Sequence, residues 1–164
     1  MTHTPRLGFP GAAVAFVIAI SGCEGSPGAC AGVGVESGVS VMFLREGYAD
    51  LAGASYELCA RDRCIKGKLA REDISRVSLP LPDDVDPDRG PVRFRVTPEG
   101  STSPEIDTVS EVRLKRQSDG CGGGAYNRGL AFTKDDGLIT RIPPSVSRAW
   151  HEHLKSLASP SESP

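Results

Sequence analysis

Hydrophobic and polar residues alternate along most of the chain after residue 36, which is the pattern of strands that bury one face. In residues 37–45, for example, Val39, Val41 and Phe43 fall on one side and Ser40 falls on the other. Similar segments recur at a spacing of roughly ten residues and are separated by Gly, Pro, Asp and Asn. The strands predicted in this way are residues 37–45, 54–59, 64–69, 75–81, 91–97, 108–115, 129–133 and 138–142.

Short strands at this spacing are typical of a β-sandwich. An Asp-Gly pair at Asp136 and Gly137 is a strong hairpin-turn signal and joins the last two predicted strands. The single tryptophan, Trp150, lies outside the strands, which argues against an antibody-type core. We therefore predict an all-β, antiparallel sandwich of immunoglobulin-like or transthyretin-like type over residues 30–142.

A short helix is predicted at the end of the chain. Pro143 and Pro144 end the strand pattern, and Ser145 is a candidate N-cap for a helix over residues 146–157. We expect this helix to pack on one edge or end of the sheets, the alternative being a helix that binds a partner or touches a membrane. Residues 143–164 are assigned to this helix and a disordered tail. The apolar stripe of the helix consists of Val146, Trp150, Leu154 and Leu157.

Composition and charge narrow the function classes. The 19 glycines and 13 prolines indicate many short elements joined by turns rather than a helix bundle. A formal net charge of −2 provides no basic field for a polyanion, so nucleic acid is not expected as a partner. The length of 164 residues excludes large multidomain enzymes and leaves no room for a dinucleotide-binding fold beside the predicted strands.

The first residues carry a different pattern. Residues 1–6 are polar and contain one fixed positive charge, Arg6, and residues 11–20 form an uncharged apolar run. A helix that crosses a bilayer needs about 20 apolar residues, so this run is too short to span a membrane. Its length is typical of the hydrophobic region of a secretory signal peptide. The run ends in Ile20-Ser21-Gly22-Cys23.

An aliphatic residue, two small residues and a cysteine resemble the lipobox of bacterial lipoproteins. In that family the signal peptide is cleaved before the cysteine, whose thiol carries a diacylglycerol. The resemblance implies that residues 1–22 are a lipoprotein signal peptide, that Cys23 is the lipid-attachment residue and that residues 23–29 are a tether. It also places the protein on the extracytoplasmic face of the cell membrane, held there by its N-terminal lipid anchor.

The remaining four cysteines then form an even number, as expected of an exported chain with two disulfides. Cys59 and Cys64 flank a four-residue hairpin loop, residues 60–63, and opposed residues of a hairpin lie close enough for a bridge. We predict a Cys59–Cys64 disulfide, which leaves Cys30 and Cys121 as the second pair. A zinc site is the alternative, but the spacing of these cysteines is at the edge of the zinc range and neither histidine of the C-terminal region lies near them.

No segment carries a recognised catalytic or metal-binding motif. The run of aspartates in residues 83–90 fails the calcium-loop pattern at its glycine and glutamate positions, so a solvated acidic loop is expected. Gly122, Gly123 and Gly124 lack a nucleotide-loop lysine and are expected to allow a tight turn, the alternative being close approach of a ligand. His151 and His153 are the only histidines after the predicted signal peptide. We therefore predict neither an enzyme nor a cofactor nor a metal.

The order of lipobox, early cysteine, cysteine-flanked hairpin and late Cys-Gly-Gly-Gly is similar to that of small uncharacterised lipoproteins of actinobacteria. The resemblance implies a sandwich-like domain and no known activity. We expect a lipid-anchored binding or interaction module whose partner is an envelope protein or a small ligand. The alternatives are a structural or stress-related protein of the cell envelope and a cell-envelope enzyme.

Overall fold

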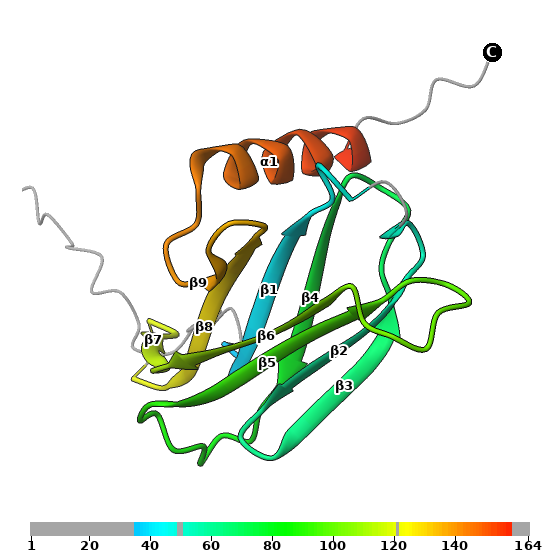
Figure 1. Cartoon of the computed structure of the whole chain (residues 1–164). Coiled ribbons are helices and arrows are strands. Elements are labelled where there is room, and N and C mark those ends of the chain that lie inside the picture. Colours follow the sequence, from blue (N-terminus) through cyan, green and yellow to red (C-terminus); the bar gives the residue numbers. More distant parts are fainter. Residues whose placement is uncertain (1–34, 49–50, 121, 159–164) are drawn as a thin grey trace, which may run out of the picture. The chain divides into compact units, whose positions relative to one another are not determined.

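A computed structural model describes residues 35–48, 51–120 and 122–158, in which two β-sheets pack face to face (Figure 1). The first sheet has the order β4-β1-β8-β7, with β9 paired to β8, and the second has the order β3-β2-β5-β6. The first sheet contains β1 (Gly38–Leu44), β4 (Ile74–Pro80), β7 (Lys115–Ser118), β8 (Gly124–Thr133) and β9 (Gly137–Ile139). The second contains β2 (Ser55–Ala60), β3 (Arg63–Lys68), β5 (Gly90–Thr97) and β6 (Ile106–Val112). The predicted sandwich-like fold with one C-terminal helix is confirmed.

The core lies between the two sheets and is built from the inward positions of each alternating strand. Phe43 of β1, Phe94 of β5 and Phe132 of β8 meet at its centre, with ring centroids 5.7 to 6.1 Å apart. Tyr48 joins this cluster at 5.9 Å from Phe43. Arg93 and Arg95 point outward from β5, as the alternation predicts. All three phenylalanines of the described residues thus lie at the contact between the sheets.

One strand pair departs from the predicted antiparallel arrangement. β1 pairs in parallel with β8, from Gly38 opposite Asn127 to Phe43 opposite Phe132. All other strand pairs of the described residues are antiparallel. Strands joined by a tight hairpin must be antiparallel, but β1 and β8 are joined through the whole second sheet, so no short turn fixes their direction. Alternation of polar and apolar residues is the same for both directions and cannot reveal the difference.

The strand predicted over residues 108–115 is two strands in two sheets. β6 ends at Val112 in the second sheet, and β7 begins at Lys115 in the first. Between them the chain crosses the sandwich, and the backbone N–H of Leu114 donates to the carbonyl oxygen of Pro87 at 3.0 Å. Val112 and Leu114 are both buried, so the alternation continues through the crossing and conceals it in the sequence.

The β2–β3 hairpin turns more tightly than predicted. Ala60 pairs with Arg63, so only Arg61 and Asp62 form the turn, and both have positive φ angles, 51° and 61°. This backbone is that of a type I′ turn, whose twist suits a hairpin although glycine or asparagine is usual there. The side chain of Arg61 donates to the backbone carbonyl of Asp88 and passes over Gly90, where a Cβ atom would overlap the guanidinium.

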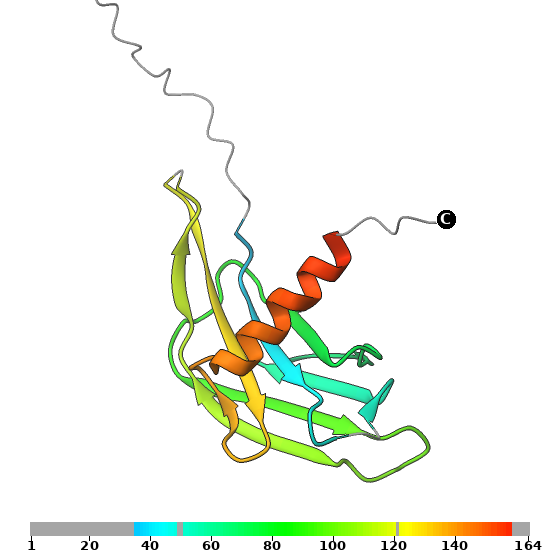
Figure 2. The ribbon, with the colours of Figure 1, turned by 90° about the horizontal axis from the view of Figure 1, so that it is seen from above.

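The helix α1 (Pro144–Ala158) lies across the end of the first sheet where β1 ends and β4 begins (Figures 1 and 2). It starts at Pro144 rather than after a Ser145 cap, because proline is favoured in the first helical turn, where its missing N–H is not needed. The predicted stripe is buried only in its first half. Val146 is 2% exposed and Trp150 is half-buried, whereas Leu154 and Leu157 are 43% and 69% exposed. The expected packing of the helix on the sheet end is confirmed for its N-terminal turns.

Candidate functional site

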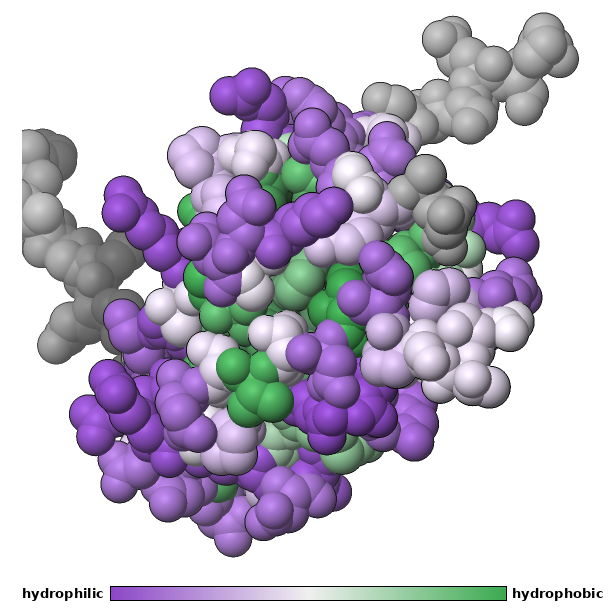
Figure 3. All heavy atoms as spheres, in the orientation of Figure 1, coloured by the Kyte–Doolittle hydropathy of each residue, from purple (hydrophilic) through white to green (hydrophobic). Residues whose placement is uncertain are grey.

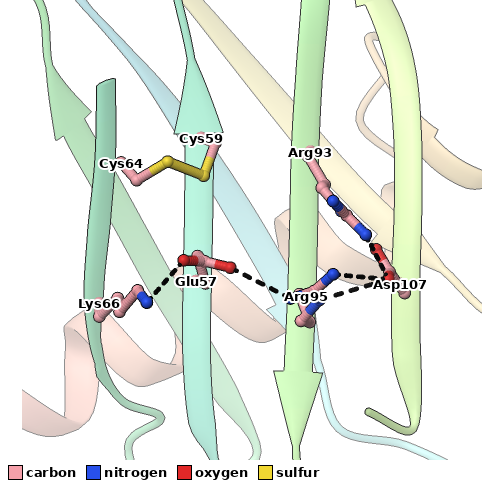
Figure 4. The surroundings of a disulfide bond; sticks show 7 residues. All are labelled: Glu57, Cys59, Cys64, Lys66, Arg93, Arg95 and Asp107. Carbon is pink, nitrogen blue, oxygen red and sulfur yellow. Dashed lines mark hydrogen bonds and ion pairs between the residues drawn. A yellow bond between two sulfur atoms is a disulfide. The ribbon is translucent and has the colours of Figure 1, made fainter. Parts of the chain in front are cut away.

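Charged side chains form a continuous ladder across the outer face of the second sheet (Figure 4). Lys66 of β3, Glu57 of β2, Arg95 of β5 and Asp107 of β6 lie in one row and alternate in sign. Lys66 Nζ lies 2.9 Å from Glu57 Oε1, and Arg95 lies 3.5 Å from Glu57 and 3.1 Å from Asp107. Arg93 also holds the Asp107 carboxylate with two bonds, of 2.7 and 2.6 Å. The ladder ties together all four strands of this sheet.

These contacts lower the pKa of both carboxylates. Hydrogen bonds from Arg93, then from Arg95, lower the pKa of Asp107 from 3.8 to about 2. A hydrogen bond from Lys66 is the largest cause of the lowered pKa of Glu57. Because each carboxylate is matched by cations of the same sheet, the ladder is best explained as a stabilising feature rather than as a reactive centre.

Replacing Asp107 with asparagine is expected to lower the free energy of unfolding at pH 7 by roughly 1 kcal/mol, the upper end for partly exposed ion pairs. Because folding lowers the pKa of Asp107, its contribution is present above the unfolded pKa near 3.8 and is lost as the pH falls toward about 2. The melting temperature of D107N should therefore fall less steeply with decreasing pH over this window than that of the wild type. The control is D83N, at an exposed aspartate outside the ladder. Parallel pH profiles of D107N and wild type would contradict this assignment.

The predicted Cys59–Cys64 disulfide is confirmed, and it lies one row away from the ladder on the same face (Figure 4). The two residues are directly opposed in the β2–β3 register, with Cα atoms 4.1 Å apart. The bridge joins the edge strand β3 covalently to its only partner strand. Glu57 and the two sulfur atoms lie within 4.8 Å of one another, the only such group of potential metal ligands among the described residues. Both sulfurs are held in the disulfide, so they offer no thiolate to a metal.

An open groove lies beside α1, and we call it the α1 groove. Its volume is about 1280 Å³. One wall is α1 itself, and the other consists of the end of β1 with the turn after it and the segment that leads into β4. Apolar side chains of Leu44, Ile74 and Ala149 contribute to the lining. The complete lining is residues 44–47, residues 71–74, Ser145, Arg148, Ala149, Glu152, His153 and Ser156.

Charges of both signs line the α1 groove, and most of them form no ion pair with a described residue. Arg45 and Asp73 are the exceptions: the side chain of Arg45 is only 17% exposed and donates to the carbonyl oxygen of Arg71 at 2.7 Å and to Asp73 at 3.1 Å. The charged lining residues without an ion pair to a described residue are Glu46, Arg71, Glu72, Arg148 and Glu152. Free carboxylates and guanidinium groups in one groove are suited to holding a polar ligand by ion pairs and hydrogen bonds.

The two histidines of α1 occupy different surroundings. His153 lines the α1 groove and packs against Trp150 with tilted rings, whose centroids are 5.4 Å apart, whereas His151 is exposed and is not part of the lining. The hydroxyl of Ser156 donates to the backbone carbonyl of His153 at 2.7 Å. The proton of this hydroxyl is therefore directed to the backbone rather than to the imidazole, so the pair is not arranged as a nucleophile and its base.

A second, smaller depression of about 330 Å³ lies on the uncovered part of the first sheet. Residues from β1, β4 and β8 line it, among them Ser40, Ser78 and Gly129. At its rim the side-chain amide of Asn127 donates to Gln117 at 2.8 Å. Arg128 also lines it, and the Nε atom of Arg128 is the only buried side-chain nitrogen or oxygen of the described residues without a hydrogen-bond partner.

The acidic loop, residues 83–90, and the loop that contains Gly122, Gly123 and Gly124 make local contacts of a structural kind. Asp86 accepts a hydrogen bond from the backbone N–H of Asp88 at 2.8 Å, and Asp88 pairs with Arg113 at 2.9 Å. Gly122 and Gly124 have φ angles of 89° and 152°, which side-chain-bearing residues rarely adopt. A Cβ atom on Gly124 would also lie 2.5 Å from the carbonyl oxygen of Gln117. These positions therefore require glycine, whereas the expected turn at Cys121 lies partly outside the described residues.

Several sequence-based assignments lie outside the described residues. They are the signal peptide over residues 1–22, the lipid-attachment residue Cys23, the tether over residues 23–29 and the Cys30–Cys121 disulfide. These assignments remain predictions. No helix among the described residues is long and apolar enough to cross a membrane.

Comparison with known proteins found no matching protein family, no matching curated protein and no matching solved structure. The functional interpretation therefore depends on the residues and geometry of this chain alone.

Proposed function

We propose that the protein is a lipid-anchored extracytoplasmic binding module that holds its ligand in the α1 groove. The anchor is the predicted diacylglycerol on Cys23, and the groove lies between α1 and the segments at the end of β1 and the start of β4. The observation that supports binding most directly is the set of charges of both signs in this groove that form no ion pair with a described residue. Charged groups left without partners in a concave surface are available to a ligand, whereas those of the ladder are already paired.

The disulfide supports the extracytoplasmic location in this proposal. Cys64 is exposed, and the Cys59–Cys64 bridge lies at an edge strand where reductants of a cytosol would reach it. Disulfides of this kind persist in oxidising compartments outside the cytosol. The lipobox-like sequence before Cys23 and the disulfide therefore point to the same compartment from independent parts of the chain.

We expect the variant C23A either to leave the membrane fraction and appear in the soluble fraction, or to accumulate as the unprocessed precursor. The reason is that two or more acyl chains give stable membrane attachment, and a slightly acidic domain gains nothing from anionic lipid headgroups in their place. Fractionation of cells followed by immunoblotting measures the change. S26A, three residues further on, is the matched control and should stay in the membrane. The anchor would be refuted by a C23A protein that is processed and still membrane-bound.

Ligand binding is tested with the low-molecular-mass fraction of the cell envelope. Trp150 is the only tryptophan of the chain and packs against His153 of the groove, so its fluorescence reports on occupation of the groove. We expect the fraction to change this fluorescence in the wild type and to lose most of its effect on R148A. His151 lies on the same helix outside the groove lining, so H151A should respond like the wild type. Equal responses of R148A and wild type would contradict binding in the groove.

A further inference from the structure

We infer that the ligand of the α1 groove is a short peptide with a free amino group and a free carboxylate. This inference rests on the proposed function and adds the chemical class of the ligand. It depends on three properties of the groove: its size, the distribution of its unpaired charges and the donors that Arg45 keeps available.

The size of the groove exceeds that needed for a small metabolite. Sites for drug-sized ligands have volumes of roughly 300–1,000 Å³, and the α1 groove has about 1280 Å³. It is also open along its length between two walls rather than closed around a single group, since a helix forms one side and turns at the sheet end form the other. An elongated ligand of a few residues fits this form better than a compact metabolite does.

Each wall carries both signs of charge. On the helix, Arg148 and Glu152 are one turn apart, and on the opposite wall Arg71 and Glu72 are adjacent. A ligand with a single sign of charge would pair with half of these groups and be repelled by the other half. A zwitterionic peptide can satisfy both, with its carboxylate on guanidinium groups and its amino group on carboxylates. Its backbone amides can also bond to the hydroxyl of Ser145 at the groove.

Arg45 is the most buried cation of the groove, and it is only partly used by the protein. A guanidinium has five N–H donors, and Arg45 donates two hydrogen bonds, to the carbonyl oxygen of Arg71 and to Asp73. These two bonds fix its plane, and the remaining donors have no partner among the described residues. A fixed guanidinium with free donors is well suited to a carboxylate, so we place the ligand carboxylate at Arg45 and Arg148 and the amino group toward Glu152.

Tetra-alanine with free termini is the probe that tests this inference, because its only charges are the two that the inference requires. The full chain is titrated with four forms of the peptide: free, N-acetylated, C-amidated and capped at both ends. Trp150 fluorescence gives the affinity. We expect saturable binding of the free peptide and a loss of roughly tenfold in affinity for each cap. Equal affinities for the free and the doubly capped peptide would overturn the inference, as would no saturable change at millimolar concentrations of the free form.

Variants of α1 test which group meets which terminus. On R148A, C-amidation should cost much less affinity than on the wild type, because the partner of the carboxylate is already weakened, and N-acetylation should cost as much as before. On E152A the two effects should be reversed. H151A is the control and should retain the wild-type pattern. Circular dichroism melts establish that the variants fold. If R148A and E152A lose affinity equally for all four forms, the assignment of termini is wrong.

The envelope fraction distinguishes this inference from the proposed function. If the envelope fraction changes the fluorescence and none of the four peptides does, the groove binds another class of ligand. The inference then fails and the proposed function stands. No change with either would contradict both.

Discussion

Replacing Phe94 with alanine is expected to lower the free energy of unfolding by about 3–5 kcal/mol, the cost of removing a fully buried aromatic side chain. Phe94 is 0% exposed and lies between the sheets, with ring centroids 6.1 Å from Phe43 and 6.0 Å from Phe132. Its side chain therefore contributes to both sheets at once. Alanine would leave a cavity beside the rings of Phe43 and Phe132, and the backbones of their paired strands β1 and β8 leave little room for them to close it.

Urea unfolding followed by Trp150 fluorescence or circular dichroism measures this loss. V109A is the matched control, because Val109 lies on the neighbouring strand β6 but is 57% exposed. V109A should lower the free energy of unfolding by no more than about 1 kcal/mol, the range of strand preferences. A loss of less than about 1 kcal/mol for F94A would contradict the placement of Phe94 at the centre of the core. The aromatic content of the chain is low, so each of these few rings carries a larger share of the core than in an average domain.

Removing the Cys59–Cys64 disulfide is expected to have the second largest effect, roughly 2 kcal/mol for the double variant C59A/C64A. The bridge spans five residues in sequence, so it closes a short loop and restricts the unfolded chain less than a long-range bridge would. The position of the bridge at an edge strand offsets part of this smaller entropic effect. β3 is an edge strand whose exposed residues are mainly charged, and it pairs with β2 alone.

Urea unfolding of C59A/C64A, compared with S55A/K68A, isolates the covalent contribution. Ser55 and Lys68 are opposed on the same two strands, so the control removes a cross-strand pair without removing a bond. We expect S55A/K68A to lose less than half of what C59A/C64A loses. Equal losses would mean that strand pairing, rather than the covalent link, explains the effect.

The inward residues of the sandwich were predictable because alternation depends only on local sequence. Alternation in the predicted strand 91–97 assigns Val92, Phe94 and Val96 to one face, and all three are buried. It assigns Arg93 and Arg95 to the other face, where they form part of the ladder with Asp107. The sequence did not reveal the ladder itself, because its members come from four strands and are aligned only by the register of the sheet. In Figure 3, hydrophilic residues cover much of the visible face, and hydrophobic residues occupy a smaller central area.

The topology was less predictable than the pattern. The crossing from β6 to β7 is invisible in the sequence because both sides of it are buried, at Val112 and Leu114. The final strand was predicted too long for a related reason: β9 ends at Ile139, but the next apolar residue, Ile142, also packs in the cluster beneath α1. Apolar residues outside a strand can serve a second core, and this chain has one beneath α1.

The α1 groove was not predicted at all, and no local signal could have shown it. Its charged residues lie in three segments, at Arg45, at Arg71 and at Arg148, that are separated by most of the chain. They meet only because α1 folds back over the end of β1 and the start of β4. The sequence showed an amphipathic helix, and the structure adds that the polar side of this helix forms a wall of a groove.

The intact mass of the protein extracted from membranes with detergent tests the central claim, a lipid-anchored extracytoplasmic module, most directly. The account predicts a chain that begins at Cys23, carries a diacylglycerol on that residue, and gains the mass of four hydrogens on reduction as two disulfides open. Tandem spectra of the N-terminal and the 59–64 peptides locate the lipid and one of the bridges. A chain that retains residues 1–22, or a mature chain with a free Cys23 thiol and no lipid, would contradict the account.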